Sequence, residues 1–191
     1  MSVNRWRSLR SIATLDAVEG STSRLHVLQD EVDERVQQME RSHGAWPCRA
    51  GCDTCCRRLG ALPSVSDVEF AELWRGFSAL PLAVRHQVRR RIATLAADAA
   101  GHYVCPLLDE ESGRCHVYAV RPTACRTYGF YSGRDGDYWC DRVTEHIGDK
   151  RDTLVAGNQL AIDRRRDAQF GPSVDLVTRF AAAHDGSNSN E

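Results

Sequence analysis

The stretch "CRAGCDTCC", residues 48–56, decides how the rest of the chain is interpreted, because it places four cysteines within nine positions. Cys48-x3-Cys52 and Cys52-x2-Cys55 both have the short spacing that lets two thiolates of one loop bind the same ion. The same spacing suits an iron–sulfur cluster. The adjacent Cys55 and Cys56 are harder to place on one ion, because neighbouring side chains of an extended segment point to opposite sides. We therefore expect either one spare thiol or more than one metal.

A second group of cysteines follows further along the chain, and no cysteine of the sequence lies outside the two groups. Cysteines of an ordinary core behave as small hydrophobic residues and would be scattered among the apolar positions of the helices. Their segregation predicts one metal site that joins both groups. The candidate metal ligands are Cys48, Cys52, Cys55, Cys56, Cys105, Cys115, Cys125 and Cys140.

Zinc and iron are the metals that these residues predict, because both accept soft thiolate ligands. Ligand type alone does not separate a zinc site from an iron site or an iron–sulfur cluster. Histidine is a common metal ligand in general, but eight cysteines make it unnecessary here; His116, and then His102 and His146, are minor candidates. The pattern identifies no catalytic residue and no organic cofactor.

The composition places the chain among soluble globular proteins, with 191 residues, 42% of them hydrophobic and 27% charged. A net charge of −1 argues against a nucleic-acid partner. No apolar run approaches the ~20 residues of a membrane helix, and the first residues lack the apolar core of a secretory signal. We therefore expect a cytoplasmic protein without a membrane partner. In that reducing compartment a cysteine pattern indicates metal binding or catalysis rather than disulfides.

Arginines accompany the cysteines along the chain: Arg49, Arg57, Arg58, Arg114, Arg121, Arg126 and Arg142. Guanidinium groups near thiolates would compensate their charge and lower the pKa of the thiols. A chain with 24 arginines and a single lysine also places some arginines near cysteines by composition alone. Both interpretations stay open on the sequence.

The remaining sequence predicts helices around the cysteine groups. Leu25, Leu28, Val32, Val36 and Met39 recur at helical spacing, which predicts an N-terminal helix that breaks or restarts near Gly20 and ends at Gly44–Pro47. Between the cysteine groups, Ser66 and Glu69 form a capping box for a helix that carries Phe70, Leu73, Trp74 and Phe77 on one face. A second helix begins near Pro81, so that a helical hairpin is expected.

Short extended pieces are expected in residues 103–140: a β-hairpin around the turn "DEESG" and one helical turn after it. Residues 152–170 and 173–184 are helix candidates. The sequence thus predicts a mainly α fold with small irregular or β elements around a cysteine-rich metal site, possible also as α+β. A single domain, 1–191, is the simplest account. Within it we expect a helical segment (1–45), a metal-binding core (46–145), C-terminal helices (146–184) and a disordered tail (185–191).

Three blocks, "CRAGCDTCC", "CPLLDEESGRCHVY" and "RPTACRTYGF", resemble the bacterial cysteine-cluster (CxxCxxCC) family, a zinc- or iron-chelating domain. The family pattern is C-x(2–3)-C-x2-CC, then C-P-[FL]-L, a G-x-C turn and RP-x2-C-R. These elements fall on Cys48, Cys52, Cys55 and Cys56; Cys105, Pro106 and Leu108; Gly113 and Cys115; and Arg121, Pro122, Cys125 and Arg126, with Cys140 in a less fixed position. The match spans about residues 48–131.

What the resemblance implies is metal chelation rather than a defined reaction. A similar cysteine region occurs in flagellin lysine N-methylases, where it looks like an iron–sulfur site. The present chain shows no separate substrate domain and no Gly-rich cofactor loop, so methylation is not carried over.

Three functions remain open on the sequence. The first is a metal-binding protein that chelates zinc or iron through both groups of cysteines. The second is a small iron-dependent redox or protein-modifying enzyme, with a pocket lined by Tyr103, Tyr128, Tyr131 and Trp139. The third is a metal- or redox-responsive regulatory protein, whose N-terminal helix would contact a protein partner that the sequence does not identify.

Overall fold

The computed structural model describes residues 7–98, 100–133 and 136–185, and the tail predicted over 185–191 falls almost entirely outside this part. The helices are α1 (Arg7–His43), α2 (Thr54–Arg57), α3 (Asp67–Ser78), α4 (Leu82–Ala93), α5 (Thr123–Thr127), α6 (Asp141–Ile147), α7 (Gln159–Phe170) and α8 (Leu176–Asp185), with 3-10 turns at Tyr118–Val120 and Gly148–Thr153. The strands are β1 (Ser64–Val65), β2 (Leu108–Asp109), β3 (Arg114–Cys115), β4 (Tyr131–Gly133), β5 (Gly136–Tyr138), β6 (Gly157–Asn158) and β7 (Val174–Asp175). The predicted mainly α fold with small β elements is confirmed.

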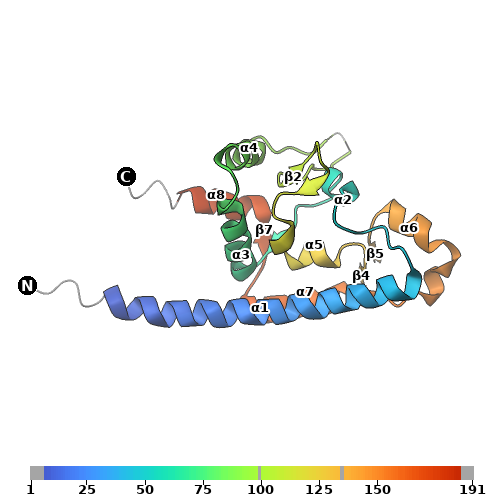
Figure 1. Cartoon of the computed structure of the whole chain (residues 1–191), viewed down its shortest axis with the longest axis horizontal. Coiled ribbons are helices and arrows are strands. Elements are labelled where there is room, and N and C mark those ends of the chain that lie inside the picture. The colour runs from blue at the N-terminus through green and yellow to red at the C-terminus, as the bar shows by residue number, and fades with distance from the viewer. Residues whose placement is uncertain (1–6, 99, 134–135, 186–191) are drawn as a thin grey trace, which may run out of the picture.

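Helix α1 runs along one side of the molecule, and α7 lies beside it (Figure 1). Leu25, Leu28, Val32 and Met39 are buried, as their helical spacing predicts. The expected break near Gly20 is wrong, because α1 continues through it. A glycine inside a helix costs only about 1 kcal/mol relative to alanine, which does not by itself end a helix.

Three hydrophobic cores hold the described residues together, and the smallest of them joins α1 to α7 through Leu25, Leu28 and Phe170. The other two are larger. The α3–α8 core lies among α3, α4, α8 and the β2–β3 hairpin, and its buried residues are Val65, Leu73, Phe77, Val88, Cys105, Leu107, Leu108, Val117, Leu176 and Phe180. The α1–α6 core lies where the last turns of α1 meet β4 and α6, and its buried residues are Val32, Met39, Trp46, Phe130, Tyr131, Val143 and Ile147. Cys56 and Cys115 pack against the α3–α8 core and Cys48 and Cys140 against the α1–α6 core, so the cysteine loops lie between the two.

The capping box at the start of α3 is confirmed, since the Ser66 hydroxyl accepts a hydrogen bond from the Glu69 amide and the Glu69 carboxylate accepts one from the Ser66 amide. The same carboxylate also accepts a hydrogen bond from the Thr123 amide at 2.8 Å. One buried side chain therefore caps α3 and fixes the start of α5 against it. The sequence signal for the cap was local, whereas the link to α5 depends on the tertiary fold.

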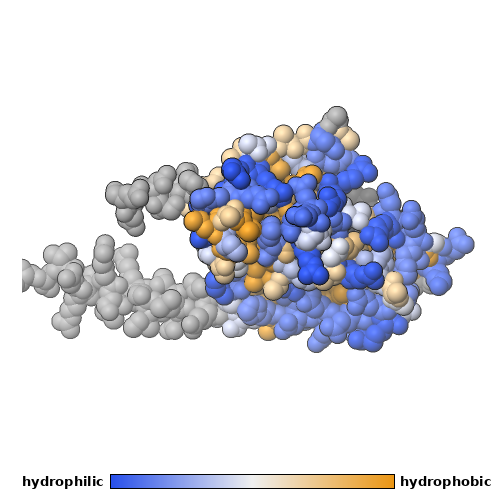
Figure 2. Space-filling view, turned by 45° about the horizontal axis from the view of Figure 1, so that its top comes forward, coloured by the Kyte–Doolittle hydropathy of each residue, from blue (hydrophilic) through white to orange (hydrophobic). Residues whose placement is uncertain are grey.

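The β-hairpin predicted around "DEESG" is confirmed, with Leu108 paired to Cys115 and Asp109 to Arg114. Strands β1 and β7 pair antiparallel, and β4 lies between β5 and β6. The helix expected over 152–170 begins only at Gln159, and α6 was not predicted. Across the described residues, no helix has the length and apolar character that a membrane span requires. Hydrophilic residues dominate the face drawn in Figure 2, and hydrophobic ones gather toward the end that carries α3 and α8.

Candidate metal centre

All eight cysteines are free thiols, and all eight line one cavity of about 730 Å³ between the two cores. The two cysteine groups of the sequence are therefore brought to a single place in the fold. The cavity wall also receives residues from α1, α5 and α7, so that it is shared by segments from the whole described chain.

The first cysteine is held by the loop that follows α1. The indole of Trp46 is buried, and its Nε1 donates a hydrogen bond to the Gly129 carbonyl at 3.0 Å. Gly129 has a φ of +93°, and a Cβ placed there would lie only 2.3 Å from the Cys48 Sγ. This glycine is needed both for its left-handed backbone and for the space that the Cys48 thiol occupies.

Short elements position the cysteines that follow. Cys55 and Cys56 lie on the single turn of α2, and the Cys56 carbonyl accepts a hydrogen bond from the Cys105 amide at 2.7 Å. Cys115 ends strand β3. Cys125 lies on α5, and Cys140 directly precedes α6. Each cysteine is thus fixed by hydrogen-bonded backbone.

Burial and neighbouring thiols both oppose the thiolate form, and they raise the pKa of several of these cysteines. Burial is the main cause that raises the pKa of Cys48 to about 12. The thiol of Cys105 is the main cause that raises the pKa of Cys56 to about 12. The pKa of Cys55 is also raised, first by its interaction with Cys56 and then by burial.

Cys125 looks contradictory at first, because its side chain is exposed by surface area while burial strongly raises its pKa. The two observations agree because Cys125 lines the cavity, so the surface that it exposes faces cavity space within the protein. A cavity wall is not bulk water, so burial is the main cause of the raised pKa of this thiol. Burial raises the pKa of Cys115 in the same way.

The arginines lower thiol pKa values only in part. Arg142 lowers the pKa of Cys48, and Arg121 lowers the pKa of Cys115 and Cys125, but burial outweighs both. Two of the arginines therefore do act on the thiols, but the net pKa of Cys48, Cys115 and Cys125 stays raised in the metal-free protein. Arg142 donates from Nη1 to the Cys52 Sγ at 3.7 Å, whereas Arg126 pairs with Asp33 of α1 at 2.6 Å.

The histidines and aromatic residues that the sequence suggested for the site differ in whether they line the cavity. None of His102, His116 and His146 is among the described residues that line the cavity. Of the four aromatic residues expected in a pocket, Tyr128 lines the cavity, while Tyr103, Tyr131 and Trp139 do not. Tyr118 was missed; it lines the cavity with the Arg121 guanidinium 4.1 Å above its ring.

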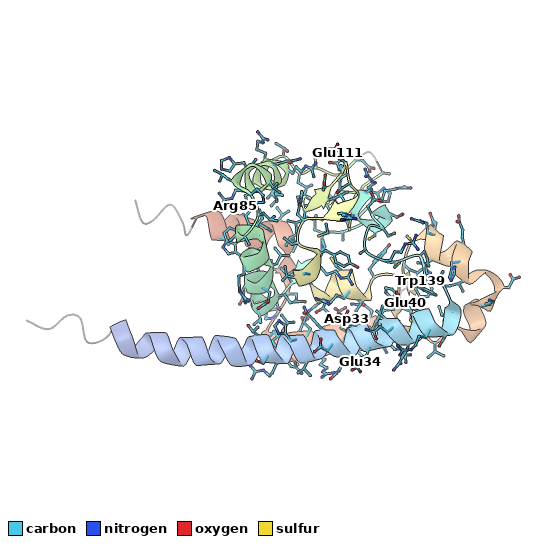
Figure 3. All side chains as sticks on the ribbon, in the orientation of Figure 1. Asp33, Glu34, Glu40, Arg85, Glu111 and Trp139 are labelled. Atoms are coloured by element: carbon cyan, nitrogen blue, oxygen red, sulfur yellow. The ribbon has the colours of Figure 1, made fainter. Side chains whose placement is uncertain are left out.

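The sequence interpretation also missed a polar wall, which we define as Gln159, Asp163 and Arg166 of α7 together with Glu40 of α1. Figure 3 shows Glu40 on the side of α1 that faces the cysteine loops. Gln159 Nε2 donates to Asp163 Oδ1 at 3.1 Å, and Arg166 pairs with Asp163 at 2.9 Å. Positions 159, 163 and 166 share one helix face, so this polar spacing was the available signal.

Gln159 and Arg166 are almost fully buried. The Gln159 Oε1 atom has no hydrogen-bond partner among the described residues. A buried acceptor without a partner is costly, which makes it available to a group that enters the cavity.

The donor set fits zinc or iron by its chemistry, because soft thiolates suit both metals. Within the described residues, no three His, Cys, Asp or Glu side chains lie close enough together to hold one ion as they stand. The thiols surround a volume instead of meeting at a point. Protons on these thiols must leave when a metal binds, since the thiolate is the ligand.

Comparison with known proteins points to the same residues. A family described as "CxxCxxCC: Putative zinc- or iron-chelating domain" has a model that matches residues 47–143, about half of the chain. The match includes all eight cysteines and ends within α6. No curated protein matches the chain significantly, and neither does any solved structure.

Proposed function

The chain belongs to the CxxCxxCC family of zinc- or iron-chelating domains, and from this premise we propose that its cysteines hold iron as an iron–sulfur centre inside the cavity. The observation that carries this proposal is that eight free thiols from two distant groups line one cavity of about 730 Å³. A protein that only needed its cysteines as core residues would have no reason to gather them all around one cavity.

The spread of the thiols favours iron–sulfur chemistry over a single zinc ion. A structural zinc ion draws four ligands to about 2.3 Å from one point. In an iron–sulfur cluster the inorganic core separates the protein sulfurs, so that thiolates around a volume serve it without converging. The absence of three converging ligands within the described residues therefore supports a cluster.

The chain's own residues have defined tasks in this proposal. Gly129 leaves room for the Cys48 thiol, and α2 holds Cys55 and Cys56. Arg142, beside the Cys52 sulfur, compensates the negative charge that thiolates acquire with the metal. The apolar cores on both sides limit access of water, which is one of the factors that set the potential of such a centre.

The test is to purify the full chain with and without oxygen and to measure iron, zinc and the visible spectrum. Iron together with broad absorption near ~400 nm is the result expected for an iron–sulfur centre. Zinc in a colourless protein would overturn the choice of iron. A folded protein without metal in both preparations would overturn metal binding altogether, and circular dichroism establishes that the fold is intact.

A second candidate is a small iron-dependent redox or protein-modifying enzyme, and the polar wall is the observation that favours it. The cavity volume lies within the range of about 300–1,000 Å³ typical of small-molecule sites. Gln159 Oε1 is a buried acceptor without a hydrogen-bond partner among the described residues. Such a group is suited to bind a donor of a substrate beside the metal.

If the chain is a redox enzyme of this kind, its metal centre should exchange electrons. Titration of the purified protein with dithionite, followed by electron paramagnetic resonance, should give a reversible one-electron signal. A centre that stays silent in both oxidation states would contradict the redox candidate while leaving metal binding intact. The regulatory alternative rests on a protein partner for α1, whose first turns project beyond the other helices (Figure 1).

A further inference from the structure

Cys125 depends for its place in the cavity on helix α5, which has only five residues. An isolated helix this short is not stable in water, so the position of α5 is set by its contacts with the rest of the fold. Thr123 and Thr127 are fully buried and share one face of the helix, because they lie four residues apart. Cys125 lies midway between them, about 200° away around the helix axis. The contacts that hold the buried face of α5 therefore also place the thiol.

The first residue of α5 is held by a buried carboxylate of α3. Glu69 is 1% exposed. Its Oε2 accepts hydrogen bonds from the Ser66 amide at 2.9 Å and from the Ser66 hydroxyl at 3.0 Å, which completes the cap of α3. Its Oε1 accepts instead from the Thr123 amide at 2.8 Å, 54 residues away in the sequence. One oxygen therefore serves α3, and the other fixes α5 against it.

A guanidinium group holds the residue that directly follows Cys125. The side chain of Arg126 is 12% exposed and pairs with Asp33 of α1 at 2.6 Å. Its Nε and Nη2 donate to the carbonyls of Arg121 and Ala119, each at 3.1 Å. Both carbonyls belong to the segment that leads into α5. One side chain thus connects α5 with the segment before it and with α1.

We propose that Glu69 and Arg126 are positioning residues for the metal centre, which hold α5 between α3 and α1 so that the Cys125 thiol stays in the cavity. This inference rests on the proposed metal-binding function. Neither side chain is among the described residues that line the cavity, so each acts through the backbone of α5 and not as a ligand. Replacing the residues that orient metal ligands typically weakens metal binding by about 10–100-fold.

The metal affinity of folded variants tests the role of Glu69. Full chains purified without oxygen are dialysed against increasing concentrations of a chelator, and the iron and zinc that remain are measured per folded chain. Glu69→Ala removes both oxygens and should weaken metal binding about tenfold or more. Ser66→Ala damages the same cap but leaves the bond to Thr123, so its metal affinity should equal that of the wild type. Glu69→Gln keeps an oxygen for the Thr123 amide and should restore most of the affinity.

The role of Arg126 is tested with a conservative change. Arg126→Lys keeps a positive charge beside Asp33 but lacks the planar fork that also reaches the two carbonyls, so it should weaken metal binding about tenfold. Arg165→Lys is the matched control, because Arg165 lies on α7 and pairs with Glu31 of the same helix α1. Its metal affinity should equal that of the wild type. This pair of variants also tests the proposal if Glu69→Ala does not fold.

Urea unfolding of the metal-free variants separates positioning from stability. A purely structural role would lower the free energy of unfolding while each folded chain still binds metal as tightly as the wild type, and that result would overturn the positioning role. Wild-type protein that holds neither iron nor zinc would instead overturn the proposed function. Weaker metal binding by Glu69→Ala and Arg126→Lys, with both control variants unchanged, supports the inference.

Discussion

The two sides of the cavity differ in the residues that build them. We call the part of the lining that the eight cysteines form the thiol side, whose residues lie on short loops and single turns. The other part is the polar wall, three of whose four residues lie on the regular helix α7. Burial holds the pKa of Cys48, Cys115 and Cys125 above the ordinary thiol value, so these thiols keep their protons until a metal replaces them. The polar wall already has its own ion pair between Asp163 and Arg166. The comparison indicates that metal binding belongs to the first side and that the second serves what lies beside the metal.

The largest effect on metal content should come from replacing a cysteine, and replacing a residue of the polar wall provides the comparison. Cys125→Ser removes a thiolate ligand and should cost half or more of the metal per chain, because a four-ligand site does not close with three. Asp163→Asn leaves all thiols in place and should retain the metal at the wild-type level. Metal analysis of both variants, after circular dichroism has shown that they fold, measures the difference.

The same experiment with Cys52→Ser extends the comparison to the first cysteine group. Metal loss from both Cys52→Ser and Cys125→Ser is expected if both groups supply ligands. Wild-type metal content and unchanged stability in Cys125→Ser would contradict a site that joins the two groups. Metal loss in Asp163→Asn would show instead that the two sides of the cavity do not act separately.

A smaller effect is expected from alanine at two glycines, one beside Cys48 and one at the C-terminal end of α7. Gly129 and Gly171 have similar left-handed φ values, +93° and +79°, but only Gly129 has the Cys48 sulfur where a Cβ would lie. Gly129→Ala should lower the free energy of unfolding by about 2–4 kcal/mol from backbone strain and overpacking combined. Gly171, with φ +79° and ψ 176°, has a backbone that essentially only glycine adopts, so Gly171→Ala should lower this free energy by about 1–3 kcal/mol from strain alone.

Urea unfolding of both metal-free variants measures this difference. Equal losses of stability would mean that the Cys48 thiol moves away without cost, and the close contact with Gly129 would then not position it. A larger loss for Gly171→Ala would contradict the role given to the loop after α1.

These contrasts also explain how much the sequence could predict. The cysteine ligands could be predicted from the sequence, because cysteine spacing is local and both groups could be recognised from it. The capping box of α3 was accessible for the same reason: Ser66 and Glu69 are three residues apart. The break expected at Gly20 failed because a weak local preference was given too much weight against the continuous helix.

The polar wall could not be predicted from the sequence in the same way. Gln159 and Asp163 become wall residues only because α7 packs beside α1, and that packing is a long-range property of the fold. The net pKa of the thiols was also beyond the sequence: nearby arginines were visible, but burial, which outweighs them, depends on the assembled cavity. The type of ligand can thus be inferred from local sequence, whereas the burial and charge around each ligand depend on the tertiary fold.

The next effect is a dependence of the free energy of unfolding on pH, which the buried cysteine thiols should cause. The pKa of Cys48 and of Cys56 rises from 9.0 to about 12 in the folded, metal-free protein. Above pH 9 the unfolded chain loses these protons while the folded chain keeps them, so that stability is fully present below about pH 9 and is lost as pH rises toward 12. Each thiol contributes at most about 1.4 kcal/mol per pH unit.

Urea unfolding of the metal-free protein at pH 8, 9 and 10 measures this loss, with Cys48→Ser as the control that should weaken it. With metal bound the dependence should reverse, because the ligands are already thiolates and protons compete with the metal as pH falls. A metal-free protein whose stability does not change between pH 8 and 10 would contradict the burial of these thiols.

The smallest effect concerns the unpartnered acceptor of the polar wall. Gln159→Met keeps the length of the side chain but removes the buried Oε1 and the hydrogen bond from Nε2 to Asp163. Removing an unsatisfied buried acceptor gains about 1–3 kcal/mol, and losing one hydrogen bond costs about 0.5–1.5 kcal/mol. A small net stabilisation of the metal-free protein is therefore expected, with metal content unchanged. Gln37→Met, on the exposed face of α1, is the matched control and should have no effect. A clear loss of stability in Gln159→Met alone would mean that Oε1 already has a partner in solution, and the polar wall would then lose its claim to bind a second group beside the metal.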